Sequence, residues 1–146
     1  NPKLFYIGMQ DQFYTFNMFD AQAWYARDVI MGRIKLPSAK AMAEHGAKWR
    51  AREETLEDAE QMIWFQGDYT KELMDQTDYP GFDVEAVNRT FMEWEHHKAE
   101  NIMGFRDNAY RSLMTGTMAP LHHTPWLQAL DDSMESYLEV KGVAAE

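Results

Sequence analysis

The sequence contains no cysteine among its 146 residues. A disulfide framework, a zinc site built on thiolates and a cysteine nucleophile are therefore excluded. The lack of cysteine is also typical of proteins from a reducing compartment, and on this ground we expect a cytoplasmic protein.

Basic side chains are few. The chain has 14 Lys and Arg against 24 Asp and Glu, which gives a formal net charge of −10. Surfaces that bind nucleic acid or anionic membranes need an excess of positive charge. The longest run without a charged side chain, residues 112–130, contains Gly116, Pro120 and Pro125, which does not fit a membrane helix. We expect neither nucleic acid nor a membrane as a partner.

Apolar residues recur at helical spacing along most of the chain, which predicts a mainly α structure of about five helices. Asn17, Ser38 and Asp83 are candidate N-caps, and residues 55–58 resemble a capping box. Gly32 is a candidate stop for the first helix. We predict helices over residues 19–31, 39–54, 55–76, from 83 onward, and 126–140.

One short segment does not fit the helical pattern. Residues 3–8 form an apolar run that ends in Gly8, and this run predicts a strand buried on both faces of a sheet. No second strand follows, although a strand must pair its backbone N–H and C=O groups. Either the segment is not a strand, or its partners lie outside this chain. We favour the second interpretation, in which the chain is the C-terminal piece of a larger α/β protein.

Recognisable catalytic and metal motifs are scarce. The chain has no glycine-rich nucleotide fingerprint and no Gly-x-Ser-x-Gly. Glu93 and His96 have the Glu-x-x-His spacing of di-iron bundles, but no second copy of this motif exists, and His122 and His123 lie in a proline-flanked stretch. We therefore expect no metal site, and a helical metal protein built on Glu93 and His96 is kept as an alternative.

The segment after Gly8 is a better candidate for binding. Gln12 offers an amide and Thr15 a hydroxyl just before a predicted helix, where they could bind the polar edge of a heteroaromatic ring. They could equally satisfy backbone groups of the turn. Trp94 fits core packing as well as a binding wall. Arg106 could interact with the last carbonyls of its helix, or bind a phosphate or carboxamide.

Longer runs of residues resemble a known family. Residues 1–8 resemble a late strand segment of the flavin-containing monooxygenases, and residues 9–32, 110–120 and 122–126 resemble the bacterial branch of that family. The resemblance implies two dinucleotide-binding, Rossmann-like domains, one for FAD and one for NADPH. It places the last strand and helix of the FAD-binding domain in residues 1–36, and a helical C-terminal extension in residues 37–146.

The resemblance also implies roles for single residues. Gln12 and Thr15 match residues that contact FAD, and Arg106 matches an arginine that contacts NADP. Trp94 matches a tryptophan in the wall of the active site. In the family, NADPH reduces FAD, and O2 then forms a C4a-hydroperoxyflavin. This species oxygenates the nitrogen of small tertiary amines such as trimethylamine, or the sulfur of sulfides.

On this reading the partners are the upstream part of the same polypeptide, a small amine or sulfide, and O2, and a homodimer stays open. We expect the 146 residues alone to be inactive, because the pyrophosphate-binding fingerprints are not in them. The alternative function is a self-standing acidic helical binding module without catalytic activity.

Overall fold

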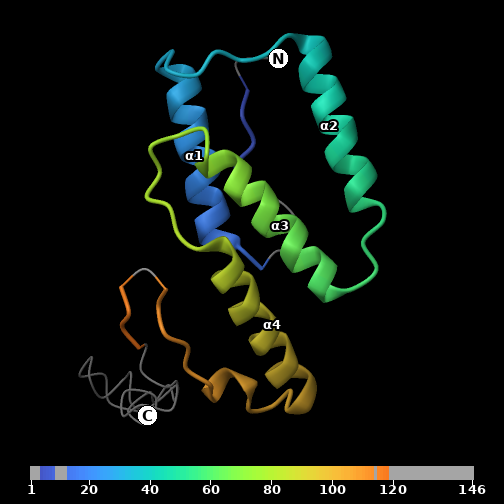
Figure 1. Ribbon diagram of the computed structural model, residues 1–146, viewed down its shortest axis with the longest axis vertical. Helices are drawn as coiled ribbons and strands as arrows, with labels where there is room; N and C mark the ends of the chain where they lie inside the picture. The colour runs from blue at the N-terminus through green and yellow to red at the C-terminus, as the bar shows by residue number, and fades with distance from the viewer. Residues whose placement is uncertain (1–3, 9–12, 114, 119–146) are drawn as a thin grey trace, which may run out of the picture. The chain divides into compact units, whose positions relative to one another are not determined.

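The computed structural model describes residues 4–8, 13–113 and 115–118 (Figure 1). This part of the chain is helical, which confirms the expected mainly α structure. The helix predicted over residues 126–140 lies outside the described residues. The described elements are α1 (Thr15–Ile30), α2 (Ala39–Glu53), α3 (Ala59–Met74), α4 (Val84–Glu100) and a short 3-10 helix, η1 (Phe105–Asp107).

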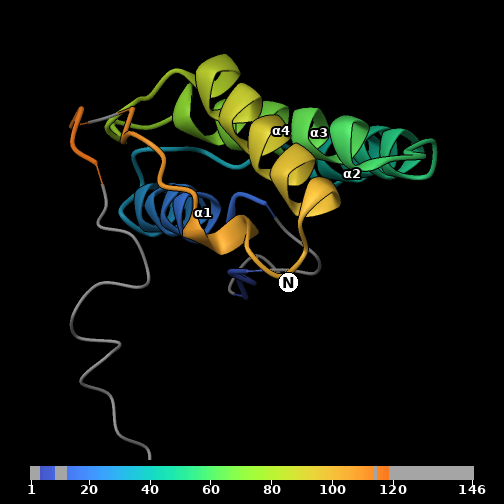
Figure 2. The same ribbon diagram turned by 90° about the horizontal axis from the view of Figure 1, so that it is seen from below.

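The chain divides into two compact units, Asn1–His97 and Lys98–Glu146. The first unit contains α1 to α3 and most of α4. Figure 2 shows α2, α3 and α4 in one layer with α1 on one side of it. The second unit contains η1 and an isolated antiparallel bridge between Arg111 and Met118. No helix in the described part of the chain is long and apolar enough to cross a membrane.

Helix α1 begins earlier than its sequence signals predict. Its first residue is Thr15 and its N-cap is Tyr14, which makes no side-chain capping bond, so the prediction of Asn17 as N-cap was wrong. Tertiary contacts of Tyr14 decide the start, because this residue is only 2% exposed and its hydroxyl bonds Val84 O and Asn88 Oδ1 of α4. The predicted stop at Gly32 is confirmed. This glycine has a φ of +71°, and Arg33 N donates to Asp28 O at 2.8 Å as in a Schellman motif.

The starts of α2 and α4 follow the predicted caps. Ser38 Oγ accepts from Ala41 N at 3.2 Å, and Asp83 Oδ1 accepts from Ala86 N at 3.0 Å. Both bonds satisfy an N–H group that has no partner within the helix.

Helix α3 starts one turn later than residues 55–58 suggested. Asp58 is the N-cap and its Oδ1 accepts from Gln61 N at 2.8 Å. Gln61 Oε1 accepts in return from Glu57 N at 2.9 Å. The capping interactions therefore lie at Asp58 and not at Thr55: Gln61 accepts from the N–H of the residue before the cap, and Thr55 turns its hydroxyl back to Arg52 O.

The core of the first unit lies where α1 packs against α3, with the start of α4 beside them. A close approach of α3 and α4 depends on Gly67. A Cβ on this residue would lie 2.5 Å from Asn88 Oδ1 and 3.0 Å from Val84 Cγ1. The buried apolar residues of this cluster are Tyr14, Met18, Ala21, Met74 and Val84.

Residues 4–8 are not a strand in the described structure, which corrects that part of the prediction. Leu4, Tyr6 and Ile7 are 56%, 81% and 52% exposed. The physical reason is the one that made the segment unusual: no other described segment offers it a ladder of backbone partners. Pairing with residues outside this chain stays a prediction.

Candidate functional site at the start of helix α1

Two of the candidate site residues, Thr15 and Trp94, lie at or beside the start of α1. Thr15 is the first residue of the helix and is exposed. The first turn contains no acidic side chain, and the N-cap provides no side-chain acceptor. A helix N-terminus of this kind carries unpaired N–H groups and a partial positive charge. It can bind an anionic or electron-rich group.

The two residues before Thr15 are held by a glutamine from another helix. Gln66 of α3 is only 4% exposed. Its Oε1 accepts from Phe13 N at 2.8 Å and from Tyr14 N at 3.4 Å. One buried carbonyl oxygen therefore pairs with two N–H groups that precede the helical ladder.

The side chain of Tyr14 is anchored separately. Its hydroxyl lies 2.6 Å from Asn88 Oδ1 and 3.1 Å from Val84 O, both acceptors on α4. Burial raises the pKa of Tyr14 far above its ordinary value, and the negative charges of Asp68 and Asp83 raise it further. The hydroxyl therefore stays protonated and acts as a donor. Asn88 Nδ2 is buried and has no hydrogen-bond partner among the described residues.

A second glutamine holds the chain on the other side of residues 9–12. Gly8 N donates to Gln22 Oε1 at 2.7 Å, and Gln22 Nε2 donates to the Tyr69 hydroxyl at 3.1 Å. Gly8 has a φ of +84°, and a Cβ there would lie 3.2 Å from the Phe19 ring. Gln12 lies outside the described residues, so its proposed contact with FAD stays a prediction.

Trp94 lies beside the start of α1. Its ring meets that of Phe13 edge-on, with centroids 6.5 Å apart and planes at 83°. Phe13 also contacts Phe91 at 5.9 Å. The structure thus brings Trp94 next to the segment that leads into Thr15. Edge-on contacts of this kind also pack hydrophobic cores, and the role of Trp94 as an active-site wall stays a prediction.

Arg106 belongs to the second unit. It lies in η1 and is exposed, with its guanidinium carbon 4.4 Å from the centroid of the Phe105 ring. A guanidinium on an aromatic face keeps its N–H groups available for phosphate or carboxamide oxygens. Its predicted contact with NADP is untested.

The metal motif does not assemble a site in the described part of the chain. Glu93 and His96 are both exposed. No group of three or more potential ligands with metal-binding geometry occurs among the described residues. His122 and His123 lie outside them.

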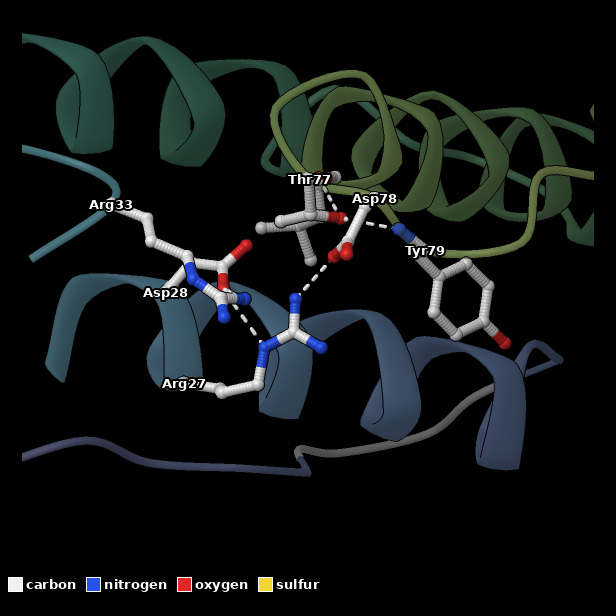
Figure 3. Close-up of polar contacts among 7 residues, drawn as sticks. Arg27, Asp28, Arg33, Thr77, Asp78 and Tyr79 are labelled. Carbon is white, nitrogen blue, oxygen red and sulfur yellow. Dashed lines mark hydrogen bonds and ion pairs between the residues drawn. The ribbon is translucent and has the colours of Figure 1, made fainter. Parts of the chain in front are cut away.

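Sequence reasoning missed a charged cluster at the other end of α1, shown in Figure 3. The buried carboxylate of Asp28 pairs with Arg27 Nε at 2.8 Å and with Arg33 Nη1 at 3.1 Å. Arg27 also pairs with Asp78, in the connection between α3 and α4. The bond from Arg27 lowers the pKa of Asp28 despite its burial, and it raises the pKa of Arg27. These groups stay ionised near neutral pH, so they tie α1 to the connection and do not transfer protons.

The sequence contained one signal for this cluster. Gly32 reverses the chain after α1, and the reversal returns Arg33 to the last turn of the helix, where Asp28 lies. The partner Asp78 has no such local signal, because it is 51 residues away from Arg27.

A shallow groove of about 270 Å³ was also missed. It is lined by residues 5–7 and by side chains of α1, α2 and α3. On its wall His45 Nε2 lies 2.5 Å from Glu72 Oε1. Trp49 Nε1 lies 3.2 Å from Glu72 Oε2 and 3.2 Å from His45 Nε2. The imidazole and the carboxylate pair with each other and join α2 to α3.

Known proteins match the chain over nearly all of its length. A curated trimethylamine monooxygenase from Roseovarius sp. (strain 217) is 62% identical over 138 residues, 94% of this chain. Another from Methylocella silvestris is 56% identical over 146 residues, 100% of the chain. The chain matches one segment of the trimethylamine monooxygenases. No protein-family model matches it.

A solved structure also shares the fold. The crystal structure of Tmm from Pelagibacter sp. strain HTCC7211 has a TM-score of 0.78 and 55% sequence identity, and the match covers 91% of this chain and 30% of that one. The resemblance inferred from the sequence is therefore confirmed. The chain spans 31% of the Roseovarius trimethylamine monooxygenase and 32% of the Methylocella trimethylamine monooxygenase.

Proposed function

We propose that the chain is the C-terminal part of a flavin-containing monooxygenase that oxygenates the nitrogen of small tertiary amines such as trimethylamine. The observation that carries this proposal is the 62% identity over 138 residues to a trimethylamine monooxygenase. Identity of this level over nearly the whole chain favours a shared reaction. Oxygenation of sulfides, a homodimer and a cytoplasmic location stay predictions.

The start of α1 fits the polar edge of a flavin ring. Thr15 is exposed there, and the first turn carries neither an acidic side chain nor a side-chain cap. A hydroxyl and free N–H groups at a helix N-terminus suit the electron-rich carbonyl edge of such a ring. We propose that Thr15, together with Gln12, contacts FAD in the full-length protein, with residues 1–36 as part of the FAD-binding domain and residues 37–146 as a helical extension.

The other two predicted residues take supporting roles in the proposal. Trp94 would form an apolar wall that excludes water and accepts a methylated amine against its ring face. Arg106 would bind an anionic or carboxamide group of NADPH. FAD and NADPH would supply the redox chemistry with O2, and this chain would bind and orient them.

The test uses the full-length protein. We expect it to purify with FAD and to consume NADPH in a trimethylamine-dependent manner, with trimethylamine N-oxide detected by mass spectrometry. The Thr15→Val variant should raise the dissociation constant of FAD about fivefold, since one hydrogen bond contributes about 1 kcal/mol. Thr55→Val is the matched control, because this exposed hydroxyl bonds only Arg52 O in the described structure. Protein that binds no flavin would contradict the proposal.

A further inference from the structure

Two buried glutamines hold the chain on either side of residues 9–12. Gln22 Oε1 accepts from Gly8 N at 2.7 Å, and Gln66 Oε1 accepts from Phe13 N at 2.8 Å. Gln22 is 8% exposed and Gln66 is 4% exposed. Both belong to helices that pack against each other, α1 and α3. Gly8 and Phe13 are therefore hydrogen-bonded to two helices that pack against each other.

These two glutamines are not explained by packing alone. A buried amide side chain is less favourable than an apolar one unless its polar atoms are paired. Here each oxygen pairs with backbone N–H groups outside any helical ladder, 14 residues away for Gln22 and 52 to 53 residues away for Gln66. A leucine would fill similar space but would leave the buried Tyr14 N–H and the partly buried N–H groups of Gly8 and Phe13 without these acceptors. The pairing defines the backbone path that leads into α1.

Gln66 acts on the residue immediately before the candidate flavin contact. Tyr14 is fixed twice, through its N–H by Gln66 at 3.4 Å and through its hydroxyl by Asn88 at 2.6 Å. Thr15 follows directly as the first residue of α1. A change in the Tyr14 backbone would move the Thr15 hydroxyl and the first free N–H groups of the helix together.

We propose that Gln66 is a positioning residue for flavin binding, with Gln22 in support. Gln66 holds the peptide before Thr15 so that the hydroxyl and the helix N-terminus face the flavin in one orientation before the flavin arrives. The inference rests on the proposed function, because it takes FAD to be the ligand at this end of α1. It goes beyond the proposed function because it states that Gln66, a side chain of α3, holds the start of α1 in its binding conformation before FAD binds.

The first test compares three variants of the full-length protein. Gln66→Leu removes the acceptor at nearly constant volume, and Gln66→Glu keeps an oxygen at the same place. Thr70→Val is the matched structural control. Thr70 is fully buried one turn further along α3, and its hydroxyl donates to Gln66 O at 2.8 Å, with no hydrogen bond to Gly8, Phe13 or Tyr14 in the described structure.

Two readouts separate positioning from general stability. Hydrogen exchange of peptides covering residues 8–14 is measured in flavin-free protein, and the dissociation constant of FAD is measured by flavin fluorescence. For Gln66→Leu we expect faster exchange and a dissociation constant raised about tenfold, as when only about a tenth of the molecules keep the binding conformation. Gln66→Glu should recover most of the affinity. Thr70→Val should lower the thermal midpoint but change the FAD constant less than about twofold.

The outcomes discriminate between the two proposals. If wild-type protein binds no FAD, the proposed function fails together with this inference. If wild-type binds FAD but Gln66→Leu and Thr70→Val change affinity equally, only the positioning role of Gln66 is overturned. If Gln66→Leu does not fold, Gln22→Leu takes its place, with the same expected direction for exchange at Gly8 and for FAD affinity. Unchanged values for Gln22→Leu would then overturn the inference.

Discussion

Helices α1 and α2 have nearly the same length, 16 and 15 residues, but they are attached to the molecule in opposite ways. Helix α1 buries five residues, among them the polar Gln22 and Asp28. Helix α2 buries none. The length and capping of a helix therefore say little about how firmly it is held; the contacts of its faces decide this.

The contacts of α2 are aromatic and partly exposed. The Trp49 ring lies edge-on to Phe65 and Tyr69, with centroids 5.2 and 5.5 Å away. Arg52 pairs with Asp68 at 2.6 Å, and both side chains are more than two-fifths exposed. Exposed ion pairs contribute little, about 0–1 kcal/mol. The ring contacts of Trp49 therefore contribute more to the attachment of α2 than this exposed ion pair does.

Helix α1 is held by buried polar groups, whose hydrogen-bond partners are protein atoms. Tyr14, Gln22 and Asp28 are all buried, and each has a hydrogen-bond partner within the first unit. Losing a partner of this kind leaves an unpaired polar group, which costs about 1–3 kcal/mol. The candidate flavin contact at Thr15 thus lies on the more firmly held of the two helices.

The largest effect should come from the anchor of α1. Tyr14→Ala should lower the free energy of unfolding by about 3–5 kcal/mol, as for other buried aromatic side chains. Tyr14→Phe keeps the ring and removes only the hydroxyl, so about 1–2 kcal/mol is expected. The thermal midpoint and hydrogen exchange of α1 measure both. Equal losses for the two variants would show that the hydroxyl bonds, and not the ring, hold this end.

A pair of glycines gives a related contrast, between the close packing of α3 against α4 and the more open surface of α2. Gly67→Ala places a Cβ 2.5 Å from Asn88 Oδ1, and we expect a loss of about 2 kcal/mol because α3 and α4 must separate. Gly46→Ala on α2 meets only Arg50 Nη1 at 3.9 Å. It should stabilise the protein by about 0.5–1 kcal/mol through helix propensity. Thermal melting of both variants measures the two signs, and the same sign for both would contradict the contrast.

Local chemistry could be predicted from the sequence, and distant contacts could not. Ser38, Asp83 and Gly32 act within a few residues of themselves, and their roles are confirmed. Asn17 failed as a cap because the contacts of Tyr14 with α4, 70 and 74 residues away, set the start of α1. No local pattern encodes such a pairing.

In the candidate site, too, single residues could be selected from the sequence but their distant contacts could not. Thr15 and Trp94 were selected from spacing and resemblance, and the structure places Trp94 next to the Phe13 ring. Gln66 was missed, because a glutamine within a helical stripe gives no sign that its amide bonds a backbone 53 residues away. A polar residue on an otherwise apolar helix face was the one available signal. The strand predicted over residues 3–8 depends on partners that the described residues do not supply.

A smaller effect is expected from the anchor of α2. Trp49→Ala removes two edge-on ring contacts and the N–H contact with Glu72, which together contribute about 1.5 kcal/mol. Amide exchange should increase along α2 and stay unchanged along α1. Glu85→Gln is a suitable control, because its pair with Arg89 is exposed on α4. Faster exchange in α1 would mean that the two helices are coupled.

The smallest expected effect is the pH dependence of stability that comes from the charged cluster at the end of α1, and this dependence is absent near neutral pH. The bond from Arg27 lowers the pKa of Asp28 in the folded state, so the carboxylate stabilises the fold fully above its unfolded pKa of about 3.9. This contribution is lost as the pH falls through the lower folded value. Stability near neutrality should therefore be insensitive to pH through this group. The stability difference between wild type and Asp28→Asn should shrink as the pH falls below about 4, and thermal melting across this range measures it. A difference that instead grows on acidification would show that Asp28 is destabilised by burial more than it is stabilised by Arg27 and Arg33.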